Sequence, residues 1–270
     1  MKKIPIIAAA AITLAATGSA QAQSYQGLDV DTGHSRIAYD DETVSTSKVD
    51  ASVAYGFGSA FGVQGDLGYV GLNGDDDGDA FSFRLLGRYD VDRALSLGVG
   101  IGTLQPVDED DLDDGPYYSL QAMYVGGPLR VQGGWTYYDG DDDPSHALSV
   151  AGEFEFVPGV SKAYGEANRL NMENAYADEL VASYEQGFGS FDLHGEVTRA
   201  RYDDDAATGV YLGGSVDLSP EVALYGELGQ VYKGDDQGNA VNAGLRWQMG
   251  RGATGDLFRT PLNKLDFAGF

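Results

Sequence analysis

The chain has 270 residues, with 42 acidic against 17 basic side chains, no cysteine and a formal net charge of −25. This charge repels nucleic acid, and the lack of cysteine excludes thiol catalysis and cysteine-ligated metal. The 17 tyrosines and 11 phenylalanines argue against a disordered acidic chain.

Residues 1–22 are predicted to be a cleaved export signal. Lys2 and Lys3 form its basic start, Ile4 to Ala16 its apolar stretch, and Ala20-Gln21-Ala22 a small-residue cleavage site. The apolar stretch is too short to span a bilayer as a helix, although a retained anchor is the alternative. Cleavage removes two lysines and leaves 248 residues with a net charge of −27. This length is enough for one barrel or sandwich. No later segment is continuously apolar for eighteen residues, so a membrane role would require strands.

Fourteen strands are predicted from the alternation of apolar residues with small or polar ones. They lie near 25–38, 46–56, 60–72, 80–90, 94–104, 116–126, 128–138, 146–156, 160–169, 177–187, 190–202, 208–217, 221–232 and 239–249. Most are close to the length of about 9–11 residues that a tilted strand needs to cross a hydrocarbon core, whereas strands of soluble sheets average about five or six. Weaker segments leave a range of 12–16 strands.

Three segments alternate poorly: 25–38, 160–169 and 190–202. In the first, apolar residues share a face with His34 and Arg36, which predicts a bulge near Gly33. The second mixes polar and small residues on both faces. In the third, Arg199 and Arg201 follow the apolar positions on the same face. They are predicted to lie near the outer rim of a membrane barrel, where a charge costs little.

Acidic runs and short connections separate these strands in strict alternation. The acidic runs are Asp40 to Glu42, Asp75 to Asp79, Asp108 to Asp114, Asp139 to Asp143, Glu173 to Glu179, Asp203 to Asp205 and Asp235-Asp236. The short connections are Gly56 to Ala60, Asp90 to Ala94, Gly126 to Pro128, Val157 to Gly159, Gly187 to Ser190 and Asp217 to Glu221. One end of the sheet is therefore predicted to carry longer acidic loops and the other end tight turns, as in a barrel that crosses an outer membrane.

Aromatic residues gather at both predicted ends of the strands. Those at the turn end are Tyr55, Phe57, Phe61, Tyr89, Tyr124, Phe156, Tyr184, Phe188 and Phe191, and those at the loop end are Tyr69, Phe81, Trp135, Tyr137, Tyr202 and Tyr232. Two such bands are typical of interface girdles, although aromatic residues favour strands in any case. The combined features predict an all-β fold: a transmembrane up-and-down antiparallel β-barrel over 23–250, followed by a tail at 251–270 of unassigned role.

The chain resembles Gram-negative outer-membrane β-barrels, and porin-like channels in particular. Ala54-Tyr55-Gly56-Phe57-Gly58 and Tyr184-Glu185-Gln186-Gly187-Phe188-Gly189 look like the strand-end turns of small porins. The terminal Phe270 resembles the aromatic end that the barrel-assembly machinery reads. Two features depart from the pattern of trimeric porins: the third acidic loop is short, and a tail containing Pro261 follows the last strand.

If the apolar face meets lipid, the opposite face lines the lumen. The pore-lining side chains are then predicted to be Arg84, Arg88, Arg130, Arg246, Asp66, Glu153, Glu155, Glu185, Asp192, Glu196 and Glu227. Three of the four arginines lie in the first half of the chain, and six of the seven acids lie in the second half. A basic wall and an acidic wall are therefore predicted to partly face one another and to select polar solutes. The alternative is a closed, salt-bridged interior, although fourteen strands enclose more space than side chains fill.

The seven acidic runs hold 25 of the 42 acidic residues. Their carboxylates are predicted to be solvated, with loose binding of divalent cations as a weaker alternative. The candidate ligands are Asp75, Asp76, Asp77, Asp141, Asp142 and Asp143. No cofactor is expected. Cations held there could bridge the loops to anionic lipid headgroups.

Catalysis is not expected. His34-Ser35 and Ser145-His146 are adjacent pairs whose side chains point to opposite faces of a strand, and no serine shares the face of His194. The predicted function is a porin-like channel in the outer membrane for small hydrophilic solutes or ions, with cation preference from its acidic mouths. The alternatives are a closed structural or surface-interaction barrel and a secreted soluble β protein. The expected partners are outer-membrane lipid, lipopolysaccharide and the assembly machinery, not nucleic acid, and the oligomeric state is left open.

Overall fold

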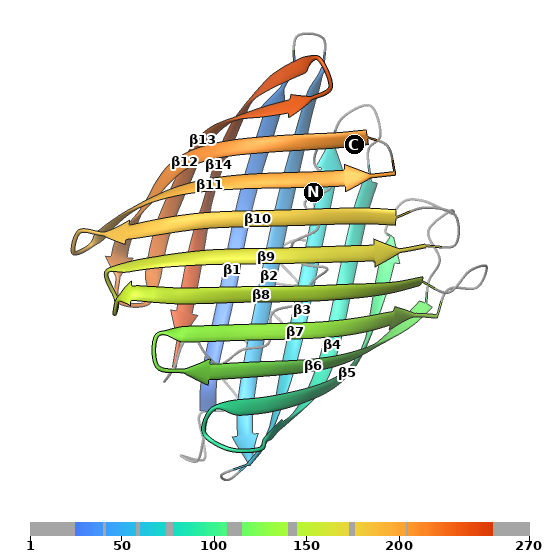
Figure 1. Ribbon diagram of the computed structural model, residues 1–270, viewed down its shortest axis with the longest axis vertical. Helices are drawn as coiled ribbons and strands as arrows, with labels where there is room; N and C mark the ends of the chain where they lie inside the picture. The colour runs from blue at the N-terminus through green and yellow to red at the C-terminus, as the bar shows by residue number, and fades with distance from the viewer. Residues whose placement is uncertain are drawn as a thin grey trace, which may run out of the picture.

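Fourteen consecutive strands close into one antiparallel up-and-down barrel in the computed structural model, in which β1 also pairs with β14 (Figure 1). The structure describes residues 25–39, 42–57, 60–73, 78–106, 115–139, 145–172, 176–203 and 205–250. The predicted fold class and strand number are therefore confirmed. The predicted export signal and the tail at 251–270 lie outside the described residues. None of the described segments is a helix with the length and apolar character needed to cross a bilayer.

The strands are long and their bounds are close to those predicted. They are β1 Tyr25–Ala38, β2 Thr43–Phe57, β3 Phe61–Asn73, β4 Gly78–Asp90, β5 Leu95–Pro106, β6 Gly115–Gly126, β7 Leu129–Tyr138, β8 Ser145–Val157, β9 Ser161–Asn171, β10 Tyr176–Gly187, β11 Phe191–Tyr202, β12 Asp205–Ser219, β13 Val222–Lys233 and β14 Asp236–Met249. In Figure 1, β7 to β11 cross in front of β1 to β4.

The bulge predicted near Gly33 is wrong. Leu28 to Ala38 pair without interruption with both β14 and β2, and the register shifts only between Tyr25 and Gly27. His34 and Arg36 therefore remain on the exterior face near the loop end of β1, where His34 Nδ1 lies 3.0 Å from Ser47 Oγ. No bulge is needed to turn them inward, because a polar side chain near the rim costs little.

The exterior face of the barrel is apolar along most of its height. Large side chains such as Val99 and Leu212 remain exposed, at 64% and 69%. In the described strands, six charged side chains fall on this face: Arg36, Asp79, Arg169, Asp178, Arg199 and Arg201. All six lie within four residues of the loop end of their strand. Because a charge at mid-bilayer costs about 2–4 kcal/mol, this distribution matches a lipid-facing surface.

Aromatic rings on the exterior face border the apolar belt, as predicted. At the turn end Phe61 and Tyr89 pack with ring centroids 5.0 Å apart, and at the loop end Trp135 and Tyr137 stack at 6.1 Å. Tyr202 is an exception: it follows the exterior Arg201 in the alternation, so it belongs to the interior face. The girdle prediction therefore holds for the other rings named here and fails for Tyr202.

The two ends of the barrel differ less in connection length than predicted. Two of the acidic connections, 203–204 and 234–235, contain only two residues, as short as the tightest turns at the opposite end. The loop after β5 is the longest, at 107–114. In the turn after β4, Asp92 accepts hydrogen bonds from the N–H groups of Ala94 and Leu95 at 2.7 and 2.8 Å, which hold the pKa of its carboxyl below the usual value.

The β8–β9 turn depends on Gly159. Val160 N donates to Val157 O at 2.9 Å, and Gly159 has φ +67° after Pro158, an arrangement typical of a type II turn. A Cβ at Gly159 would meet no atom within 4 Å, so its cost is conformational rather than steric. We expect Gly159→Ala to lower the free energy of unfolding by about 1–2 kcal/mol in urea titrations of refolded protein.

Gly78 supplies the matched control for this turn. A Cβ there also meets no atom within 4 Å, but Gly78 does not have a positive φ. Gly78→Ala is expected to leave the unfolding free energy unchanged or slightly raised. An equal loss of stability in both variants would contradict the left-handed requirement at Gly159.

On the interior face, tyrosine rings lie across glycines of neighbouring strands. A Cβ at Gly244 would stand 2.3 Å from Tyr225 Cζ, and a Cβ at Gly102 would stand 2.3 Å from Tyr117 Cζ. Tyr117 Oη donates to Phe83 O at 3.3 Å. These glycines let the rings lie close against the wall.

Candidate functional site

All eleven predicted pore-lining side chains lie on the face opposite to the exposed apolar residues. They are Asp66 on β3, Arg84 and Arg88 on β4, Arg130 on β7, Glu153 and Glu155 on β8, Glu185 on β10, Asp192 and Glu196 on β11, Glu227 on β13 and Arg246 on β14. Residues that pair directly across antiparallel strands share a face. The pairing around the barrel therefore places these side chains on one continuous interior surface.

Arg84 and Asp66 form a buried ion pair on this surface. They are direct partners on β4 and β3, with Nε 2.7 Å from Oδ2 and exposures of 1% and 3%. The second oxygen of Asp66 accepts hydrogen bonds from Ser52 Oγ at 2.6 Å and Gln64 Nε2 at 2.7 Å. The interior wall at β2–β4 is therefore a packed polar network in which the arginine is already neutralised.

Two other predicted arginines also have carboxylate partners. Arg88 Nε lies 2.6 Å from Asp90 Oδ1, and Arg246 Nε lies 3.2 Å from Asp31 Oδ2. Tyr225 Oη donates to Asp31 at 2.9 Å. Sequence reasoning missed both aspartates. Asp90 was recognisable, because it stands two residues after Arg88 on the same strand face.

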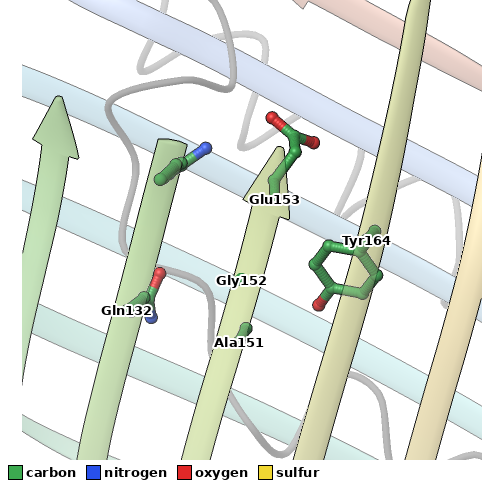
Figure 2. Close-up of a pocket in the computed structure, with 6 residues that line it drawn as sticks. Gln132, Ala151, Gly152, Glu153 and Tyr164 are labelled. Atoms are coloured by element: carbon green, nitrogen blue, oxygen red, sulfur yellow. The ribbon is translucent and has the colours of Figure 1, made fainter. Parts of the chain in front are cut away.

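The fourth arginine lines a small interior hollow. Its walls are Arg130, Gln132, Ala151, Gly152, Glu153 and Tyr164. Figure 2 shows Gln132, Glu153 and Tyr164 on three successive strands, β7, β8 and β9. Arg130 is the direct pairing partner of Glu153, and one of its guanidinium nitrogens lies 3.3 Å from Met123 Sδ. A guanidinium and a carboxylate thus occupy paired positions on this part of the wall.

Carboxylates dominate the interior face of the other half of the barrel, from β8 to β13. Apart from Asp205 and Lys233 at the loop end, the described charges there are Lys162 and nine carboxylates: Glu153, Glu155, Glu166, Glu179, Glu185, Asp192, Glu196, Asp217 and Glu227. Lys162 Nζ lies 3.2 Å from Glu185 Oε1. One lysine cannot balance nine carboxylates, so this half of the wall is strongly acidic, whereas the arginines of β4 and β14 are paired.

Sequence reasoning missed three carboxylates of this acidic wall: Glu166, Glu179 and Asp217. Glu166 was missed because the alternation of 160–169 is weak, and Glu179 because it belongs to the acidic run Glu173 to Glu179. Glu166 accepts from Tyr164 Oη and from Asn168 Nδ2, the latter at 3.0 Å. Asn168 Nδ2 also donates to Glu179 Oε2 at 2.9 Å, so one amide joins two carboxylates on β9 and β10. The pairing of β9 with β8 removes the ambiguity by placing Glu166 beside the interior Ala151.

A second polar cluster completes the acidic wall at β11–β14. Glu227 Oε1 lies 2.5 Å from His194 Nε2, and Asn242 Nδ2 donates to Glu227 Oε2 at 2.8 Å. Ser215 Oγ donates to Asp192 Oδ2 at 3.2 Å. These contacts hold the carboxylates in place along the wall, which can attract and align cationic or polar solutes.

No group of three histidine or acidic side chains in the described ranges could hold a metal ion. The candidate cation ligands Asp75, Asp76, Asp77, Asp141, Asp142 and Asp143 lie outside the described residues, so loose cation binding there stays a prediction.

Solved structures share this fold at very low sequence identity. A monoaromatic hydrocarbon channel, CymD, is similar with a TM-score of 0.58 and 10% identity over 84% of this chain and 89% of that one. OprB of Pseudomonas putida is similar with a TM-score of 0.56 and 8% identity over 84% and 94%. No protein-family model and no curated protein matches the sequence. The likeness therefore establishes a porin-like barrel fold.

Proposed function

We propose that the protein is an outer-membrane channel through which small hydrophilic solutes or ions diffuse passively, with a preference for cations. The acidic wall on β8–β13 is the observation that carries this proposal. Charges on a pore wall concentrate counter-ions and repel co-ions, and here the opposing arginines are locally neutralised. The sequence predicts an electric field between a basic wall and an acidic wall. Because these arginines are paired, the proposed field instead runs between a nearly neutral wall and an acidic one.

Three further features support a channel in the outer membrane. The exterior face is apolar, bounded by aromatic rings and charged only near the loop end. Fourteen strands enclose more volume than side chains fill, whereas about eight do not. The structural neighbours named above, a monoaromatic hydrocarbon channel and OprB, share the barrel fold. We also propose export through the cleaved signal at 1–22, assembly by the barrel machinery and contact with lipopolysaccharide.

A closed structural or surface-interaction barrel is the second candidate. Tight packing on the β2–β7 side favours it, because Arg84, Leu86 and Met123 are almost fully buried on the interior face. The two candidates differ in conductance. A channel conducts ions when the refolded protein is inserted in a planar bilayer, whereas a closed barrel remains silent.

Reversal potentials in a tenfold potassium chloride gradient test the cation preference. The wild type is expected to give the sign of a cation-selective pore. In the variant Glu153→Gln/Glu155→Gln/Glu196→Gln, the cation-to-anion permeability ratio is expected to fall about twofold, because three wall charges are lost.

Asp79→Asn is the matched control for this test, since Asp79 lies on the exterior face at the loop end of β4. Its reversal potential is expected to equal that of the wild type. An anion-selective wild type, or a triple variant with unchanged selectivity, would contradict the role given to the acidic wall.

A further inference from the structure

Exterior charge is concentrated on three neighbouring strands. Four of the six exterior charged residues in the described strands are Arg169 on β9, Asp178 on β10, and Arg199 and Arg201 on β11. Asp178 is the direct pairing partner of both Arg169 and Arg201. The strands β9, β10 and β11 lie side by side on one face of the barrel (Figure 1). These four residues and Tyr176 are called the rim cluster below.

The rim cluster is held together by one carboxylate and one aromatic ring. Arg169 Nε lies 3.6 Å from Asp178 Oδ1, and Arg201 pairs with the other oxygen of Asp178. The same two guanidinium groups flank the ring of Tyr176, with Cζ atoms 5.2 and 4.8 Å from its centroid. Both arginines are thus oriented in advance by cation–π and ionic contacts, which lowers the entropy lost when they bind a ligand.

The rim cluster keeps an excess of positive charge. It contains three guanidinium groups and a single carboxylate, and Arg169 and Arg201 remain 50% and 41% exposed. Asp203 stands nearby, and its carboxylate accepts the N–H of Tyr176 at 3.1 Å. Each guanidinium carries five N–H donors in a planar fork that matches the oxygens of a phosphate.

The height of the rim cluster on the barrel indicates the ligand. Leu180, which pairs with Arg199, is exposed on the apolar belt two residues from Asp178, and Leu148 pairs with Arg169 from β8. The cluster therefore stands at the loop-side border of the apolar belt, where acyl chains give way to headgroups. A lipid seated there would place its acyl chains against Leu148 and Leu180 and its headgroup at the arginines.

We propose that the rim cluster binds a phosphate group of an anionic outer-leaflet glycolipid, of the lipid A type, with Arg169, Arg199 and Arg201 as donors. The inference rests on the proposed outer-membrane location, since the loops of such barrels face the outside. It differs from cation bridging by the acidic loops, because here the protein contacts the phosphate directly. Lipid bound at β9–β11 would anchor the half of the barrel that carries the acidic wall.

Native mass spectrometry of the detergent-solubilised protein, titrated with diphosphoryl lipid A, tests the proposal. The wild type is expected to bind at least one lipid A, and Arg169→Gln/Arg201→Gln to bind it about tenfold more weakly, because two charge-assisted contacts are lost. Arg36→Gln, which removes an exterior arginine from β1 at the same rim but outside the rim cluster, is the matched control and is expected to bind as the wild type does.

Equal affinity of the wild type and the double variant would overturn the proposal. So would displacement of lipid A by an equal concentration of inorganic phosphate, because the site would then serve a free anion. If the double variant does not fold, Arg199→Gln provides the test, since Arg199 faces Leu180 rather than Asp178. Channel conductance is expected to be normal in these exterior variants, so a failed lipid site and a failed channel proposal give different results.

Discussion

Lysine in place of Val150 is expected to destabilise the folded barrel by about 2–4 kcal/mol, enough to impair assembly. Val150 lies in the middle of β8 on the exterior face and is 52% exposed. Its neighbours across the sheet are Gly133 and Ala167, which offer no carboxylate for the new ammonium group. The lysine would have to reach the headgroups from the centre of the apolar belt, and the free energy of unfolding from urea titrations in lipid vesicles measures the cost.

Ala151→Lys is the control for Val150→Lys, because it places the same charge at the same height on the interior face. Ala151 pairs with Gln132 and Glu166, so its ammonium group meets polar and acidic surroundings. Its effect on the unfolding free energy is expected to be within about 1 kcal/mol. If both lysines are tolerated equally, the exterior face does not contact lipid, and the soluble β protein becomes the better reading.

The alternation of side chains was sufficient to predict the fold and the interior face. Because successive residues of a strand point to opposite faces, Phe83 and Leu85 on one side predict that Arg84 lies on the other. The same rule put all eleven predicted side chains on the face opposite to the exposed apolar residues. It worked poorly in β9, where Lys162, Tyr164 and Glu166 alternate with small residues rather than large apolar ones. Glu166, the one acidic residue of that strand, was therefore missed.

The pairing of Arg246 with Asp31 and of Arg84 with Asp66 was not predictable by the same rule. Asp31 and Arg246 meet only because β1 and β14 close the barrel, and 215 residues separate them in the chain. Asp66 and Arg84 meet because of the exact register of β3 and β4. Register depends on hydrogen-bond pairing across strands, which periodicity within one strand does not reveal. A basic wall was predicted for this reason, where the structure has neutral pairs.

The cost of placing a charge against lipid explains why exterior charges are confined to the rim while interior charges are not. On the exterior, charges are tolerated only at the rim, which confines Arg169, Asp178 and Arg201 to one level and brings them into contact. On the interior, charges occur along the whole wall, and the sequence is free to set their sign. The excess of carboxylates on β8–β13 is therefore a property of this chain rather than of the barrel fold.

Asp66→Ala is expected to lower the free energy of unfolding by about 3–5 kcal/mol, because it removes the carboxylate that faces the buried guanidinium of Arg84. Ser52 and Gln64 lose their acceptor in the same step, and each unsatisfied donor adds to the cost. Urea unfolding in lipid vesicles, followed by tryptophan fluorescence, measures the change.

Glu185→Ala is the comparison for an exposed ion pair on the same face. Lys162 and Glu185 are 37% and 35% exposed at 3.2 Å, so water screens their attraction and the loss is expected to be about 0–1 kcal/mol. Asp66→Asn/Arg84→Gln, which removes both charges, is expected to recover much of the stability lost in Asp66→Ala. A double variant as unstable as the single one would show that packing at β2–β4, rather than the uncompensated charge of Arg84, determines the cost.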